Sequence, residues 1–327
     1  MVPLAVNGYL KYFLYIMRLR KKNIARTFRL IVLCVPLLFS MVLPMSCSKG
    51  KKDADDGSIK ILASFYPLYI MLMNITEGIQ GVSISMLAPP DTGCLHDYQL
   101  TTKDMRSIED ADIFVVNGLG MEDFLDKVLE DNGASGKMVV ASGGYGSLSG
   151  GSLINGNPHL WVSVDGAVYQ VLEIANGLST LDPGHSDLYM ENASSYVAKL
   201  LDLSIKMHAG LDDFAGKRIV TFHEAFPYFA REFGLNLAAV IEREPGEDPS
   251  ARELDELVSL IKDLRSGGGS VALFAEPQYS SSAAEVIAAE TGLKVWELDP
   301  CVTGEIAGDA YIRAMEKNLE VLEAALR

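Results

Sequence analysis

The chain has 327 residues, 49% of them hydrophobic and 22% charged, so it is long enough for two ordinary domains with a sizeable core. Its formal net charge is −15 at pH 7, and residues 1–46 hold seven of the 28 lysines and arginines but no acidic residue. Without that segment, 21 basic residues face 43 acidic ones, a formal net charge of −22. This balance excludes nucleic-acid binding through the general surface, because phosphates would be repelled.

The first 46 residues have the pattern of an export signal, a basic stretch followed by the apolar run 30–43. That run of 14 residues is too short for a comfortable membrane span. We predict a signal peptide over 1–46, with Met17 as an alternative start. Cys47 would then carry the lipid of a lipoprotein, although the residues before it match the usual cleavage box imperfectly. A plain cleaved signal or an uncleaved anchor is the alternative, and residues 47–58 are expected to form a polar tether.

From residue 59 onward, strand-like and helix-like segments alternate in two successive runs. Such alternation predicts an α/β fold with parallel sheets flanked by helices, and two runs predict two lobes, over 59–181 and 215–327. The predicted strands are 59–64, 82–88, 112–118, 137–142, 217–222, 235–241, 270–275 and 293–298. The predicted helices lie near 67–78, 101–110, 121–131, 164–178, 225–233, 250–265, 281–291 and 309–326.

Between the two lobes, the segment 182–214 is predicted to contain one long linker helix that ends near Gly210. Asp182 and Pro183 suit its N-cap and first helical position. Apolar residues then recur every three or four positions, as one face of a helix requires. At 1.5 Å per residue this helix would reach roughly 35–40 Å, the length of a whole lobe. The stripe consists of Tyr189, Ala193, Tyr196, Leu200, Leu203 and Met207.

Three of the five histidines are predicted to lie near the carboxyl ends of strands, where open α/β sheets bind ligands. His96 lies in the loop after strand 82–88, and His223 directly follows strand 217–222. His159 ends the glycine- and serine-rich loop that precedes a helix, and that loop contains no phosphate-binding pattern. These positions place three imidazoles on the same side of the two sheets.

Two carboxylates follow strands of the second lobe in the same way, Glu276 after 270–275 and Asp299 after 293–298. Three imidazoles and one carboxylate make a suitable site for a first-row transition metal. The alternative is that these are ordinary polar loop residues. The other two histidines, His185 and His208, are expected at the surface of the long helix.

A set of ordered sequence blocks resembles the metal-binding lipoproteins of ABC importers for zinc and manganese, the cluster 9 solute-binding proteins. The resemblance covers nearly all of residues 59–327. The blocks are SFYPLY (64–69), PPDTGCLHDYQLT (89–101), DADIFVVNGLGMEDFLDK (110–127), NPHLWVS (157–163), VTFHEAFPYFAREFGL (220–235), FAEPQYS (274–280), TGLKVWELDP (291–300) and AYIRAMEKNLEVL (310–322).

This resemblance implies a metal held between two lobes that are joined by a rigid helix. By position it makes His96, His159, His223 and Asp299 the ligands, and it gives Glu276 a supporting role. Zinc is expected, with manganese as the alternative, because the manganese branch of the family typically has glutamate at the position of the third histidine. The chain departs from the family before its first histidine, where Cys94 and Leu95 stand in place of Asp-Pro, and at Gln99, where the family often has Glu.

The resemblance also implies a membrane permease and its ATPase as partners, and a monomer that acts outside the cytoplasmic membrane. It would be anchored to the outer face through lipid or be periplasmic. No enzymatic activity and no nucleic-acid partner are expected.

Two other classes of function stay open, a zinc-dependent hydrolase and a surface adhesin or metal store. The sequence HEAFP begins like the protease motif H-E-x-x-H, but Pro227 replaces the second histidine. Four protein ligands would also close the position that a catalytic zinc keeps for water.

Cys94 and Cys301 each lie two residues from a proposed ligand. An exported protein can form a disulfide, but the preferred interpretation is two small buried hydrophobic residues with free thiols.

Overall fold

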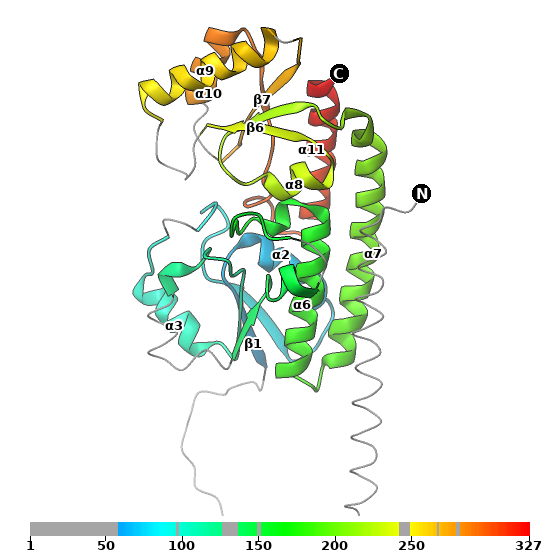
Figure 1. The fold of residues 1–327 in the computed structure, drawn as a ribbon. Helices are drawn as coiled ribbons and strands as arrows, with labels where there is room; N and C mark the ends of the chain where they lie inside the picture. Colours follow the sequence, from blue (N-terminus) through cyan, green and yellow to red (C-terminus); the bar gives the residue numbers. More distant parts are fainter. Residues whose placement is uncertain are drawn as a thin grey trace, which may run out of the picture.

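The structure is a computed structural model, and its described part confirms the predicted two-lobed α/β fold (Figure 1). The predicted signal peptide, tether and lipidation site at Cys47 lie outside the described residues, and so does His96. Within the described part, no helix is both long and apolar enough to cross a membrane. The structure describes residues 58–95, 98–125, 137–148, 152–241, 249–266, 268–278 and 282–327.

The first lobe is built on a parallel sheet of four strands in the order β2-β1-β3-β4. All four residues of β3 are buried, as expected for a central strand of a parallel sheet that is covered on both faces. In this order the chain moves outward from β1 in both directions, so the carboxyl ends of β1 and β3 form a switch point. The strands are β1 (Ile59–Ala63), β2 (Val82–Met86), β3 (Ile113–Val116) and β4 (Met138–Val140).

The second lobe repeats this topology with a parallel sheet in the order β6-β5-β7-β8. Its central strand β7 is buried along its whole length. The corresponding switch point lies at the carboxyl ends of β5 and β7, where His223 and Glu276 follow their strands. The strands are β5 (Arg218–Thr221), β6 (Asn236–Val240), β7 (Val271–Ala275) and β8 (Val295–Glu297).

Helices cover both sheets, and their ends follow local sequence signals. Thr101 and Asp104 form a capping box at the start of α3, and the Ser163 hydroxyl accepts a hydrogen bond from the Gly166 backbone at the start of α6. The first lobe contains α2 (Tyr66–Ile75), α3 (Thr102–Asp110), α5 (Tyr145–Leu148) and α6 (Val164–Leu181). The second contains α8 (Pro227–Glu232), α9 (Ala251–Ser266), α10 (Ser282–Thr291) and α11 (Ala310–Leu326). Short 3-10 turns occur at Asp123–Leu125, Leu160–Val162 and Asp212–Phe214.

The long helix α7 (Ser186–Leu211) runs beside α6 and contacts α2 of the first lobe and α11 of the second (Figure 1). Its predicted start was wrong, because α6 continues to Leu181 and Pro183 lies in the turn between the two helices. Asp182 is used differently, with its Oδ2 accepting a hydrogen bond from the Tyr189 hydroxyl at 2.8 Å and lying 2.6 Å from His185 Nδ1. The predicted apolar stripe is confirmed, since all six of its residues are buried.

The two lobes share one apolar core rather than packing as separate bodies. A single cluster of buried residues contains Phe65 and Trp161 of the first lobe together with Phe229 and Met315 of the second. Hydrogen bonds between the lobes reinforce it, since Trp161 Nε1 donates to the Pro300 carbonyl at 2.9 Å and the Tyr311 hydroxyl donates to the Trp161 carbonyl at 2.9 Å. Two smaller clusters cover the other faces of the sheets.

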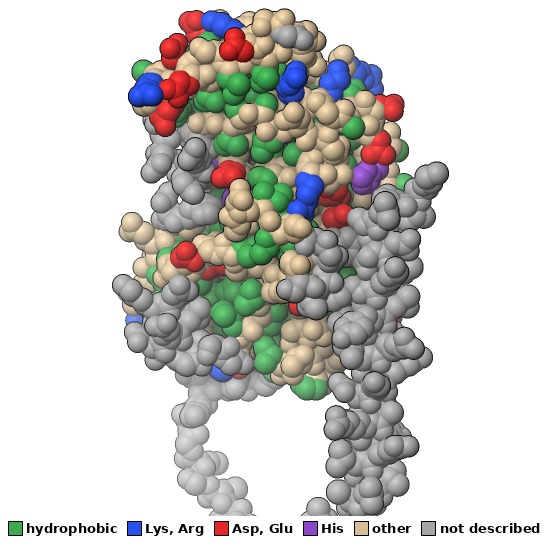
Figure 2. Space-filling model, viewed as in Figure 1, with side chains coloured by type: hydrophobic (Ala, Val, Ile, Leu, Met, Phe, Trp, Pro, Cys, Tyr) green, Lys and Arg blue, Asp and Glu red, His purple; other side chains and the backbone are tan. Residues whose placement is uncertain are grey.

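The outer end of the second lobe carries much of the charge on the face drawn in Figure 2. Acidic and basic side chains gather there over α9 and α10, and ion pairs join some of them, such as Arg252 with Glu256 at 2.9 Å. Among the other described residues on this face, apolar and uncharged atoms predominate, with scattered charged side chains.

Candidate metal centre

Three side chains from three different loops meet where the carboxyl ends of the two sheets face each other. Cys94 follows β2, His159 follows β4, and His223 follows β5. The Cys94 Sγ lies 3.6 Å from His159 Nε2 and 3.5 Å from His223 Nε2. All three potential ligand atoms lie within 4.8 Å of one another, so the chain brings a thiol and two imidazoles into one cluster.

His159 is oriented by the side chain of Asn157. The Asn157 Oδ1 accepts a hydrogen bond from the His159 backbone N–H at 3.0 Å and lies 3.2 Å from its Nδ1. The Asn157 Nδ2 donates to the carbonyl of Glu224 at 2.7 Å, which fixes the orientation of the amide. Because Oδ1 can only accept, Nδ1 of His159 carries the proton and the Nε2 of the neutral ring presents its lone pair to the cluster.

His223 is oriented in the same way by Glu276, and both side chains are buried. The Glu276 Oε1 lies 2.6 Å from His223 Nδ1 and accepts a hydrogen bond from the His223 backbone N–H at 3.1 Å. A carboxylate that holds the outer nitrogen of an imidazole is the usual partner of a metal-binding histidine. The other carboxylate oxygen, Oε2, is buried and has no hydrogen-bond partner among the described residues.

The charge around His223 strongly favours its protonated form when no metal is bound. Burial alone would lower the pKa of the ring, but the Glu276 carboxylate and the Cys94 sulfur beside it raise that pKa to about 10. A cation that binds at Nε2 must therefore displace a proton.

A buried polar network at the switch point of the first sheet supports the His159 loop. The Asn117 Nδ2 donates to the Pro158 carbonyl at 2.9 Å, and the Asn117 Oδ1 accepts from Gln170 at 2.7 Å. The Glu122 carboxylate accepts from the Ser64 hydroxyl and from the Asn117 backbone N–H, each at 2.7 Å. Burial raises the pKa of Glu122 above its usual value, and these hydrogen bonds offset only part of that rise. The sequence prediction missed this network, although polar residues directly after the buried strands β1 and β3 were a signal for it.

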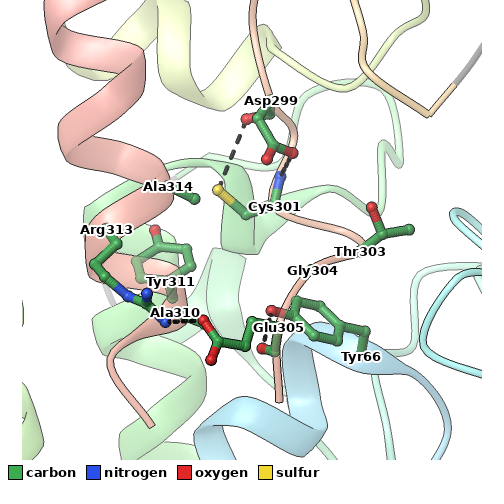
Figure 3. A pocket seen from close by; sticks show the side chains of 10 residues that line it. All are labelled: Tyr66, Asp299, Cys301, Thr303, Gly304, Glu305, Ala310, Tyr311, Arg313 and Ala314. Atoms are coloured by element: carbon green, nitrogen blue, oxygen red, sulfur yellow. Dashed lines mark hydrogen bonds and ion pairs between the residues drawn. The ribbon is translucent and has the colours of Figure 1, made fainter. Parts of the chain in front are cut away.

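Asp299, a predicted ligand, lies at the carboxyl end of β8 but is not part of the described cluster of thiol and imidazoles. Its Oδ1 accepts hydrogen bonds from Gln278 Nε2 at 2.9 Å and from the Cys301 backbone N–H at 2.8 Å. Burial raises its pKa. Asp299 instead borders a cavity of about 160 Å³ that Tyr66 of the first lobe and Cys301 also line (Figure 3).

The two cysteines of the described part form no disulfide, but they differ in their surroundings. Cys301 is buried, as predicted. The expectation that Cys94 is also a buried hydrophobic residue was wrong, because it is partly exposed and its sulfur contacts two histidines. His185 and His208, predicted at the surface, are partly exposed and lie beside Asp182 and Asp212.

The chain is similar to several known metal-binding proteins. One is the zinc-binding lipoprotein AdcA of Streptococcus pneumoniae (strain ATCC BAA-255 / R6), with 30% identity over 297 residues that cover 85% of this chain and 58% of AdcA. Another is the high-affinity zinc uptake system protein ZnuA of Bacillus subtilis (strain 168), with 27% identity over 86% of this chain and 92% of ZnuA. The solved structure of FpvC from Pseudomonas aeruginosa in complex with Mn²⁺ superposes with a TM-score of 0.71 at 27% identity, covering 82% of this chain and 98% of FpvC.

The chain thus spans little more than half the length of AdcA and nearly the whole length of ZnuA and FpvC. The family model described as "Zinc-uptake complex component A periplasmic" matches residues 61–325, which include all of both sheets except the first two residues of β1, and all three residues of the cluster. On this match the chain belongs to the ZnuA family of zinc-uptake components.

Proposed function

We propose that this protein captures a zinc ion between its lobes and delivers it to the membrane permease of an ABC importer driven by its ATPase. The convergence of His159 and His223 carries the proposal. These two histidines come from different lobes, and Asn157 and Glu276 direct their Nε2 atoms toward one point. The proposed role is that of a binding component, with no catalysis by the chain itself.

The proposed ligand set contains His159 and His223, with His96 and Asp299 completing it as the family resemblance implies. Asp299 would have to exchange its hydrogen bond with Gln278 for the metal, and Gln278 Nε2 would keep its other hydrogen bond, to the Thr303 hydroxyl at 2.9 Å. Glu276 would orient His223 without touching the metal.

For its place in the cell, we propose that residues 1–46 direct export and that lipid on Cys47 anchors a monomer to the outer face of the cytoplasmic membrane. Residues 47–58 would then serve as a tether. The lobes 59–181 and 215–327, joined by 182–214, would both be needed for the site, because His159 and His223 lie in different lobes.

Zinc is favoured over manganese because imidazole nitrogen suits zinc, whereas manganese prefers oxygen ligands. The hydrogen bonds at both Nδ1 atoms leave the two Nε2 nitrogens as the donors to the metal, once His223 has lost its proton, and a nitrogen donor set favours zinc. Manganese is the second candidate, because the similar FpvC structure is a complex with Mn²⁺.

Titration calorimetry with zinc tests the proposal. The chain should bind one zinc ion. His159→Ala and His223→Ala should each weaken binding strongly, because each removes an imidazole that binds the metal directly. His208→Ala is the matched control, since His208 lies on α7 beside Asp212 and should leave zinc binding unchanged. If either site variant binds zinc as tightly as the parent, that histidine is not a ligand. If the parent does not bind zinc, the proposed function is wrong.

A further inference from the structure

We propose that the thiolate of Cys94 is itself a ligand of the captured cation and makes the site selective for soft, thiophilic ions such as zinc. This inference rests on the proposed function and deepens it. Cys94 would take the place of one of the four ligands expected from the family resemblance, because a tetrahedral zinc site holds four ligands.

The distances in the cluster match those of a zinc site. A zinc–sulfur bond of about 2.3 Å and a zinc–nitrogen bond of about 2.05 Å, at a tetrahedral angle of about 109°, place sulfur and nitrogen about 3.5 Å apart. The Cys94 Sγ lies 3.6 Å from one Nε2 and 3.5 Å from the other. Both sulfur–nitrogen distances therefore fit one bound ion, and all three ligand atoms lie within 4.8 Å of one another.

The chemistry of the donors points to a cation as well. Both Nδ1 atoms face side-chain oxygens of Asn157 and Glu276, so each ring turns its Nε2 toward the same sulfur. In the metal-free protein the thiol can donate to one Nε2 and accept from the other if that ring is protonated. When zinc binds, the thiol proton and the imidazolium proton leave to solvent, and three lone pairs take their place.

The fold holds the sulfur at this point through its neighbour in the chain. Leu95 is fully buried in the shared core, and its carbonyl accepts a hydrogen bond from the Tyr98 backbone N–H at 2.9 Å. Gly93 adopts a left-handed conformation with φ of 83°, which lets the loop turn directly before Cys94. Leu95 therefore anchors the loop in the core, and the partly exposed Cys94 is left to face the histidines.

X-ray absorption at the zinc edge of the full chain loaded with one equivalent of zinc tests the proposal directly. We expect one sulfur neighbour at about 2.3 Å, distinct from nitrogen or oxygen neighbours at about 2.0–2.2 Å. Cys94→Ser should abolish the sulfur signal, whereas the control Cys301→Ser should retain it. A shell of nitrogen and oxygen alone in the parent, or a sulfur signal that survives Cys94→Ser, would overturn the proposal while leaving zinc capture intact.

Competition between zinc and manganese gives a second, independent readout. Cys94→Ser should weaken zinc binding by at least about 10-fold, the size that loss of even an outer-shell partner typically causes. Manganese binding should change less, because a hard ion gains little from a thiolate. Equal losses for both ions, or no loss of zinc affinity, would contradict the assignment. If Cys94→Ser does not fold, as judged by circular dichroism, the absorption spectrum of the parent alone still decides.

Discussion

Replacing Glu276 with glutamine isolates the contribution of the carboxylate behind His223. In the parent, Glu276 Oε1 lies 2.6 Å from His223 Nδ1 and accepts from the His223 backbone N–H. The amide of glutamine keeps an oxygen that can accept both hydrogen bonds, so the ring should stay in place. What is lost is the negative charge that makes the ring a better electron donor. Loss of such partners typically weakens metal binding about 10–100-fold, or about 1.4–2.7 kcal/mol.

The size of this effect should depend on pH in a defined direction. In the parent, Glu276 and Cys94 raise the pKa of His223 to about 10, so a proton competes with zinc throughout the neutral range. Removing the carboxylate lowers that pKa, which relieves the competition and partly offsets the loss of affinity. The difference between parent and variant should therefore be smaller near about pH 6.5 and grow toward about pH 9.

Competition with a chelator of known zinc affinity, at several pH values, measures this difference. Glu224→Gln is the matched control, because it makes the same charge change at an exposed residue next to His223. The control should bind zinc as the parent does, and thermal unfolding should confirm that both variants are folded. If Glu276→Gln stayed within about twofold of the parent at every pH, or if Glu224→Gln lost as much affinity, the proposed role of the carboxylate would be wrong.

Four further predictions concern the choice of ion, the release of protons, the pH dependence of stability and the packing of α7. His223→Glu should cut zinc affinity and improve the relative binding of manganese, because it replaces nitrogen with oxygen, and an unchanged ratio in competition binding would refute this. Zinc binding at about pH 7.5 should release at least about one proton, since His223 stays protonated up to its pKa of about 10. Calorimetry in buffers of different ionisation enthalpy measures this release, and the absence of any release would contradict the proposed site. The same raised pKa stabilises the metal-free fold below about pH 6.5 and loses this effect as the pH rises through about 10. Leu200→Ala, which empties a fully buried position on α7, should cost about 2–5 kcal/mol of unfolding free energy in urea, whereas the exposed Leu188→Ala should change it by less than about 0.5 kcal/mol.

Most of the fold could be predicted from the sequence because its strands belong to parallel sheets. A strand such as β3, buried on both faces, is a continuous apolar run that composition alone reveals. The stripe on α7 was equally plain, since helical spacing separated its buried residues from its exposed ones. The start of α7 could not be found this way, because Asp182 and Pro183 form a good helix-start signal and only the packing of α6 on α7 assigns them to a turn.

The site was harder to predict, because its parts come from loops that sequence spacing does not place. Residue type and position were enough to mark His159, His223 and Glu276 as candidates. His223 and Glu276 directly follow predicted strands, and His159 ends a loop. Cys94 was misjudged because a cysteine two residues before a predicted ligand looks like a departure from the family pattern. Only the three-dimensional meeting of its sulfur with two histidines shows otherwise.

The shared core of the two lobes has a kinetic consequence. Because Trp161 and Tyr311 connect the lobes through buried hydrogen bonds, a wide hinge opening would expose the core and break these bonds together. We therefore expect the dwell time of the ion to be controlled by small movements of the Cys94 and His159 loops rather than by rotation of whole lobes. Asn157 connects the His159 ring to the Glu224 carbonyl, next to His223. A displacement of one loop should therefore also displace the other. A docking partner would then need to disturb only one of these loops to shorten that dwell time.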